Sequence, residues 1–137
     1  MADITLAPAT VGYGLGASIK SRLIAGETLA PGQAVYLKTS DKKYWLADNT
    51  TLATATVFGI VLSAAVADTP TTILTAGLLT DSSAPFTEGK SYELSTTSGG
   101  IAPAGDAGST DFGTGIGFAT SSSELFVAIC NSGGQVA

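Results

Sequence analysis

The feature that most constrains this chain is the alternation of short apolar runs with turn-forming residues between Ile24 and Val66. Each run is only a few residues long and is bounded by Gly, Pro, Asn or Asp. This spacing is typical of β-strands joined by tight turns. At Pro31-Gly32, proline fixes its own φ and glycine supplies the positive φ of a type II turn. Residues 34–37 and 43–46 then predict a β-hairpin that closes over a polar tip.

The same alternation of short apolar runs and turn-forming residues continues to Cys130, and no helix of ordinary length is predicted. The expected strands are residues 22–25, 34–37, 43–46, 56–67, 71–75, 77–80, 91–95, 115–119 and 125–130. About eight or nine short strands at this spacing predict an all-β chain, folded as a single small β-barrel or sandwich. Gly59 lies inside an apolar run, which indicates a bulge or close packing at that point.

The sequence also contains a weak internal echo. Residues 31–37 resemble residues 88–94, and residues 58–63 resemble residues 114–119. The distance from turn glycine to strand glycine, Gly32 to Gly59 and Gly89 to Gly115, is nearly the same in both halves. Two related half-units would each supply similar strands to one barrel. Chance similarity explains the echo equally well, because such punctuation is generic to all-β chains.

The first twenty residues differ from the rest of the chain. From Val11 to Gly16, apolar residues alternate with glycine. In an extended strand this places the apolar side chains on one face and bare backbone on the other. One interpretation is a frayed terminus. The other is an arm that orders on a neighbouring protein, with apolar side chains in contact with it.

We therefore expect three regions: an extended N-terminal arm at 1–20, a β-barrel domain at 21–130 and a flexible C-terminal tail at 131–137. The candidate residues for contact with a partner protein or a neighbouring subunit are the apolar side chains of the arm, Ile4, Leu6, Val11, Tyr13, Leu15 and Ile19.

Composition limits the classes of partner. The net charge of −5 argues against nucleic acid, because binding there depends on Lys and Arg neutralising phosphates. No apolar run approaches the roughly 20 residues that cross a membrane as a helix, so we expect no membrane partner. The start of the chain also lacks the features of a signal peptide, which predicts a protein made and used without secretion. Few charges in a chain this apolar favour a surface that a protein partner buries.

The residues offer little for catalysis or metal binding. There is no histidine, so a Ser-His-Asp or Cys-His arrangement is impossible, and one cysteine without histidine cannot form a structural zinc site. Cys130 is interpreted as a packed core thiol. Asp106 and Asp111 flank a loop that is either a calcium site or simply solvated. We expect no enzyme and no cofactor, although scattered carboxylates leave proton transfer open in principle.

Three aromatic residues, Tyr36, Tyr44 and Trp45, lie on the predicted hairpin. Alternation along a strand sends Tyr44 and Trp45 to opposite faces, which favours core or interface packing over a sugar-binding platform.

The chain resembles the small capsid decoration (cement) proteins of tailed bacteriophages over roughly Leu23 to Ile129. The residues that carry the resemblance are Ala25–Leu29, Pro31-Gly32, Ala34–Leu37, Lys43–Asp48, Val57–Val61, Gly77, Gly89-x-x-Tyr92-x-Leu94, Gly100–Pro103 and Gly115–Ala119.

The resemblance implies a structural protein on the outer surface of a virion, made in the host cytoplasm, that stabilises the capsid by bridging capsomers. It implies the major capsid protein as partner, a homotrimer, and an N-terminal arm in contact with the capsid or a neighbouring subunit. Deletion of residues 1–20 is then expected to leave the barrel folded and to weaken assembly. Alternative functions are a phage tail or fibre module and a carbohydrate-binding domain.

Overall fold

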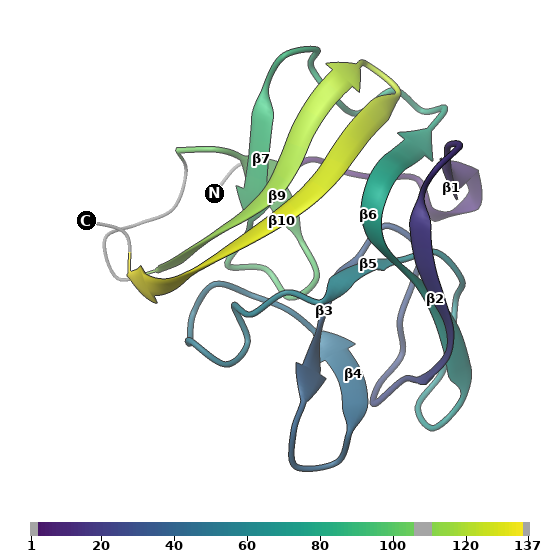
Figure 1. Cartoon of the computed structure of the whole chain (residues 1–137), viewed down its shortest axis with the longest axis vertical. Coiled ribbons are helices and arrows are strands. Elements are labelled where there is room, and N and C mark those ends of the chain that lie inside the picture. Colours follow the sequence, from purple (N-terminus) through teal and green to yellow (C-terminus); the bar gives the residue numbers. More distant parts are fainter. Residues whose placement is uncertain (1–2, 106–110, 136–137) are drawn as a thin grey trace.

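The computed structural model describes residues 3–105 and 111–135, with side chains as far as Asn131 (Figure 1). The chain is all-β, as predicted, and its strands are antiparallel. The strands are β1 Val11–Tyr13, β2 Ser18–Ile24, β3 Ala34–Lys38, β4 Lys43–Leu46, β5 Gly59–Val61, β6 Pro70–Asp81, β7 Ser91–Leu94, β8 Ile101–Pro103, β9 Phe112–Ser121 and β10 Glu124–Gln135. A single 3-10 turn, η1 Pro8–Thr10, precedes β1. Within the described ranges, no helix is long and apolar enough to cross a membrane.

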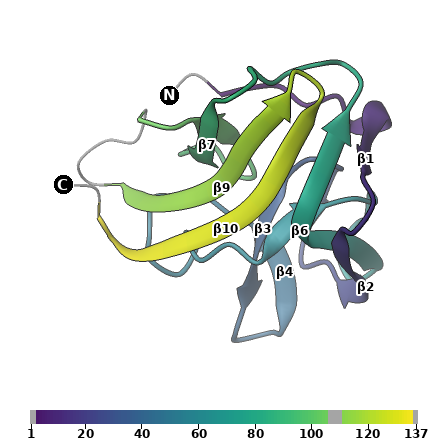
Figure 2. The same ribbon diagram turned by 45° about the horizontal axis from the view of Figure 1, so that its top comes forward.

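The long strand β6 organises the sheet. Strand order is β4-β3-β5-β6-β10-β9-β7-β8, and β1 and β2 also pair with β6. The first part of β6 lies between β2 and β5, and its last part lies between β1 and β10. Gly77, with φ of +104°, stands where the neighbours change. The resulting sheet curls into a half-barrel, and Figure 2 shows β9, β10 and β6 side by side within it.

The predicted hairpin and its turn are confirmed. Strands β3 and β4 pair with Val35 opposite Leu46 and Tyr36 opposite Trp45. Gly32 has a φ of +94°, and the Gln33 amide donates to the Ala30 carbonyl at 3.3 Å, as a type II turn requires.

Three of the expected strands are merged or shortened in the structure. The two short strands predicted at 71–75 and 77–80 form the single strand β6, because Ala76 and Gly77 remain paired across the kink. The long run expected at 56–67 contains only the three residues of β5.

The order of strands repeats in the two halves of the chain. Strands β3, β4, β5 and β6 match β7, β8, β9 and β10, and the two sets meet where β6 pairs with β10. Backbone hydrogen bonds repeat as well, since the Gly32 amide donates to Val61 and the Gly89 amide donates to Ala119, each at 2.8 Å. The structure therefore supports the interpretation of the echo as two related half-units.

The register corrects one detail of that echo. Gly59 pairs with Val35 of β3, and the residue that pairs with Tyr92 of β7 is Gly117 rather than Gly115. A Cβ at Gly59 would lie 2.4 Å from the Leu74 carbonyl oxygen, and one at Gly117 would lie 2.0 Å from the Phe126 carbonyl oxygen. Gly59 and Gly117 are thus the matching positions, and both allow a neighbouring strand to approach closely.

The half-units differ at their hairpin tips. At the β7–β8 tip, Gly99 donates its amide to the Ala47 carbonyl at 2.7 Å and accepts from the Ala34 amide at 3.1 Å. A Cβ there would lie 3.1 Å from the Cβ of Gln33. The matching residue at the β3–β4 tip is Lys42, which also has a positive φ but is exposed. Only the glycine tip is small enough to dock on the other half.

The buried side chains form two clusters. The largest fully buried ones are Leu29, Ile60, Ile73, Leu74, Leu79, Leu94, Ile101, Ile116, Leu125, Val35, Val61 and Val127. The main cluster draws on strands of both halves, whereas Leu29, Val35, Val61 and Ile73 belong to a second cluster from the first half. Ile73 and Leu74 are neighbours on β6, so the two clusters lie on opposite faces of the sheet.

The expected boundaries at residues 20 and 130 both fall inside strands. Strand β2 runs through residue 20 and pairs with β6, and the backbone of β10 continues past residue 130 to Gln135. Residues 3–20 therefore lie on the chain's own sheet rather than forming a separate extended arm.

Candidate interaction surface

The structure separates the six predicted contact residues into two groups. Ile4, Leu6, Val11 and Ile19 are half-buried and pack against the main core cluster. Ile4 forms a bridge with Ile101 at the edge of β8. These four side chains pack against other residues of the same chain, so in this conformation only part of their surface is available to a partner.

Tyr13 and Leu15 are the two predicted contact residues that remain open. Tyr13 is 58% exposed, and Leu15 is fully exposed. Gly14, between them, donates its amide to the Leu78 carbonyl at 3.0 Å. A Cβ at Gly14 would lie 2.9 Å from the Cβ of Leu78, so the glycine lets this segment lie flat on β6.

A buried carboxylate anchors the N-terminal segment to the sheet. The Asp81 carboxylate accepts hydrogen bonds from the Ala7 amide at 2.9 Å and the Thr10 hydroxyl at 2.5 Å. The amide and hydroxyl of Ser83 donate to the same carboxylate at 2.9 and 2.8 Å. Burial by itself raises the pKa of Asp81, but the hydrogen bonds from Thr10, Ser83 and Ala7 outweigh it and hold the pKa below its usual value.

Two exposed phenylalanines and one half-buried leucine form a row across β9, β10 and β6, which we call the aromatic row: Phe118, Phe126 and Leu78. Phe126 lies directly opposite Phe118 on one side and Leu78 on the other. The two phenyl rings stack with centroids 5.4 Å apart. Phe118 is 46% exposed and Phe126 is 40% exposed.

Register explains why these side chains point outward. Leu125 lies opposite Ala119 and Leu79, and all three are buried. Since successive residues of a strand alternate between faces, Phe126 and its cross-strand neighbours fall on the outer face. The predicted contact set missed this row, because Phe126 and Leu125 are both apolar and the sequence does not say which one faces the core.

The aromatic hairpin is not an open platform. Trp45 donates its indole N–H to Asp41 at 3.0 Å, and the Lys38 ammonium lies 4.6 Å from the centre of the ring. A Cβ at Gly26 would lie 2.2 Å from the indole nitrogen, so Gly26 packs against the ring. Tyr44 is buried, with its pKa raised by that burial. Tyr44 and Trp45 lie on opposite faces, as predicted, and neither presents a free ring face of the kind that sugars stack on.

Two further sequence predictions concern Cys130 and the loop near Asp111. Cys130 is exposed, which corrects its interpretation as a core thiol. Leu125 and Val127 face inward, but the register of β10 shifts between Val127 and Cys130, so the apolar run does not carry Cys130 into the core. Asp106 lies outside the described residues, so the structure describes only Asp111 of the two carboxylates in the predicted calcium site. Among the residues that the structure describes, no group of three His, Cys, Asp or Glu side chains is arranged to hold a metal ion.

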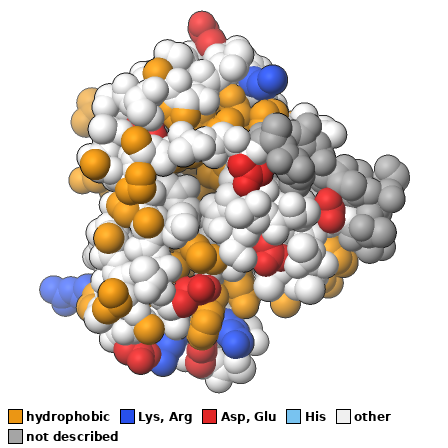
Figure 3. Space-filling model, turned by 180° about the vertical axis from the view of Figure 1, so that it is seen from behind, with side chains coloured by type: hydrophobic (Ala, Val, Ile, Leu, Met, Phe, Trp, Pro, Cys, Tyr) orange, Lys and Arg blue, Asp and Glu red, His pale blue; other side chains and the backbone are white. Residues whose placement is uncertain are grey.

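Charge is unevenly distributed over the molecule. Five of the six basic residues, Lys20, Arg22, Lys38, Lys42 and Lys43, belong to β2 and the β3–β4 hairpin. Figure 3 shows basic side chains mainly at the lower end, where that hairpin lies in Figure 1. One of them is paired, since Lys43 forms a salt bridge with Asp68 that raises the pKa of the lysine.

No family model matches the chain, and no curated protein is significantly similar to it.

Proposed function

We propose that this protein is a structural virion component that binds the outer surface of a bacteriophage capsid and stabilises it by bridging capsomers. The observation that supports this proposal best is the aromatic row on the outer face of β9, β10 and β6. Large apolar side chains gathered on an open sheet face mark a surface that another protein buries. The proposed partner is the major capsid protein, and the proposed assembly on the shell is a homotrimer.

The energy available from this surface is appropriate for such a role. Covering the exposed parts of Phe118 and Phe126 removes roughly 170 Å2 of apolar surface from water. At about 25 cal/mol per Å2 this contributes about 4 kcal/mol per copy, before the costs of association. Contacts of this size become large in sum when they are repeated over a shell. Tyr13 and Leu15 are exposed as well, but Tyr13 pairs with the inward-facing Leu79, so these two side chains form an apolar contact separate from the aromatic row.

A double substitution of the aromatic row tests the proposal. Phe118→Ser with Phe126→Ser should leave the fold intact, because both rings are partly solvated and the pair itself contributes only about 1 kcal/mol. Binding to purified capsids stripped of this protein should fall at least tenfold in a cosedimentation assay. Tyr13→Asp should weaken binding in the same assay, but less strongly.

The matched control is Val66→Ser, which removes another exposed apolar side chain from the loop between β5 and β6. Its binding should equal that of the unaltered chain. Equal capsid binding by the double variant would refute a role for the aromatic row. Copurification with phage tails and not with heads would favour the alternative of a tail or fibre module.

A further inference from the structure

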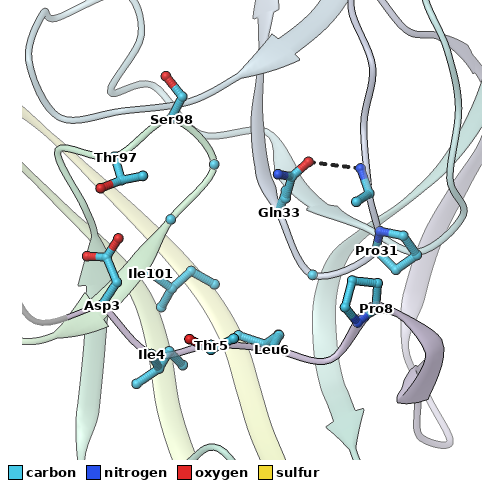
Figure 4. Close-up of a pocket in the computed structure, with 14 residues that line it drawn as sticks. Asp3, Ile4, Thr5, Leu6, Pro8, Pro31, Gln33, Thr97, Ser98 and Ile101 are labelled. Carbon is cyan, nitrogen blue, oxygen red and sulfur yellow. Dashed lines mark hydrogen bonds between the residues drawn. The ribbon is translucent and has the colours of Figure 1, made fainter.

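A cleft of about 290 Å3 lies on a part of the surface that the proposed function does not use. It forms where residues 3–8, the turn at 30–33 and the β7–β8 hairpin at 97–101 meet (Figure 4). We propose that this cleft receives a lysine side chain from the protein that this chain binds. The inference rests on the proposed function only for the identity of that partner, which would be the major capsid protein.

The carboxylate of Asp3 supplies the counter-charge. Its Oδ1 accepts a hydrogen bond from the Ser95 hydroxyl at 2.5 Å, and Ser95 is fully buried. The Thr97 amide in turn donates to the Ser95 hydroxyl oxygen at 3.0 Å. One carboxylate oxygen is thereby held in place by a serine that cannot move far, which fixes the direction of the other.

The second oxygen, Oδ2, lies close to the Gly100 backbone, and the Asp3 side chain is otherwise exposed. A Cβ at Gly100 would begin 2.7 Å from this oxygen. Glycine at position 100 therefore lets the carboxylate lie against the backbone, where alanine would displace it. In the described part of the chain Asp3 has no salt-bridge partner, and no Lys or Arg lines the cleft.

The opposite end of the cleft is apolar and rigid. Figure 4 shows Pro8 and Pro31 together at one end, with Asp3 and Thr97 at the other, while Leu6 and Ile101 lie between. Both prolines have a fixed φ, so this end keeps its shape. An occupant must therefore combine an aliphatic stem with a positively charged end, as a lysine side chain does.

The polar groups favour lysine over arginine. Arginine prefers a carboxylate that presents both oxygens to its planar fork, whereas Oδ1 of Asp3 is already engaged by Ser95. An ammonium is a compact charge with three donors, so one available carboxylate oxygen is enough to bind it. Since most of the chain's own cations lie on β2 and the β3–β4 hairpin, the charge of this end is matched by a cation from outside.

The test is a titration of the isotopically labelled full chain, followed by amide NMR. N-acetyl-lysine methylamide should shift the amides of Thr97, Gly99 and Gly100 with a saturable, millimolar response. The uncharged analogue N-acetyl-norleucine methylamide should bind about fivefold more weakly, the effect of one partly exposed charge pair. Equal binding of the two analogues, or shifts that avoid these amides, would overturn the proposal.

Two variants and a control identify the residues responsible. Asp3→Asn should reduce the affinity for the lysine analogue to that of the norleucine analogue. Gly100→Ala keeps the carboxylate but crowds Oδ2, and it should also weaken binding. Glu88→Gln removes the same charge from an exposed turn outside the cleft and should bind normally. The NMR spectrum of each variant reports whether it is folded. Unchanged binding by folded Asp3→Asn contradicts the assignment.

Capsid binding by the unaltered chain, measured beside its binding of the lysine analogue, separates this inference from the proposed function. If the unaltered chain binds capsids and its cleft ignores the lysine analogue, the cleft assignment is wrong and the proposed function stands. If the cleft binds the analogue and the chain does not bind capsids, the proposed function is wrong. The lysine would then come from a protein other than a capsid protein.

Discussion

A methyl group at Gly117 would lie 2.0 Å from the carbonyl oxygen of Phe126, and one at Gly115 would lie 3.6 Å from the Cβ of Cys130. These two glycines are two residues apart in the same strand, yet only the first is required by packing. Real Cβ atoms do not approach a backbone oxygen to 2.0 Å, so β9 and β10 would have to separate. The sheet is thus tightest where the two half-units have matching glycines, Gly59 and Gly117.

We therefore expect Gly117→Ala to lower the free energy of unfolding by about 3 kcal/mol, the upper range for overpacked sites. Urea unfolding followed by fluorescence of Trp45 measures this change.

Gly115→Ala is the matched control. Its new methyl group meets Cys130 at an ordinary contact distance, and alanine loses less backbone entropy than glycine on folding. Unfolding free energy should change by less than about 1 kcal/mol in either direction. If both variants were equally stable, the close approach of the two strands at Gly117 would be disproved.

At the scale of elements, the N-terminal segment is held by its side chains as well as by strand pairing. Ile4 and Leu6 fill positions against the core, and Asp81 collects hydrogen bonds from Ala7 and Thr10. Deleting residues 1–20 would remove β1 and part of β2 together with these contacts. Such a deletion would change stability as well as any capsid contact, so point substitutions are the cleaner test.

Asp81 makes this attachment dependent on pH. Its pKa is lowered in the folded protein, so its contribution to stability is present above the unfolded pKa of about 3.9 and is lost as pH falls through the lower, folded pKa. We expect the unaltered chain to lose stability below about pH 4. Asp81→Asn should be about 2 kcal/mol less stable at pH 7, because its amide group cannot accept all four hydrogen bonds.

Thermal unfolding measured from pH 7 to pH 3 tests this prediction. Stability of Asp81→Asn should depend less on pH than that of the unaltered chain, and Glu88→Gln, which removes an exposed carboxylate, should follow the unaltered chain. Parallel curves for the chain with and without Asp81 would show that this carboxylate is not the anchor.

At the scale of the whole molecule, the accessible surface is that of a compact body. It measures 6366 Å2, against about 6,600 Å2 for a typical folded monomer of this mass. A chain with a free twenty-residue arm would expose more surface. The N-terminal segment therefore contributes to one compact body in the isolated chain.

Small-angle X-ray scattering can test that compactness. A monomer of this length with its N-terminal segment in place should have a radius of gyration of about 14 Å. Light scattering on the same sample gives the mass and so distinguishes a monomer from the proposed trimer. A monomeric sample with a clearly larger radius and a scattering profile typical of a flexible chain would contradict the attached segment.

The sequence by itself determined most of the strands and many of their turns, although β8 was not predicted and β6 was predicted as two strands. Pro31 and Gly32 specify a local backbone geometry, and the short apolar runs around them have the length of strands, so the β3–β4 hairpin follows from neighbouring residues alone. The repeated glycines were compatible with two half-units but also with chance, and the repeated strand order favours two half-units.

Only the tertiary structure decided which faces are covered. Both faces of β10 are apolar, and Phe126 faces outward because Leu125 is paired with buried residues on two other strands. Likewise, Ile4 and Leu6 pack against core residues that lie far along the chain. Asp3 accepts a hydrogen bond from Ser95, which is 92 residues away in the sequence. A period of two specifies that side chains alternate, but the choice of inner face depends on long-range register, which neighbouring residues do not encode.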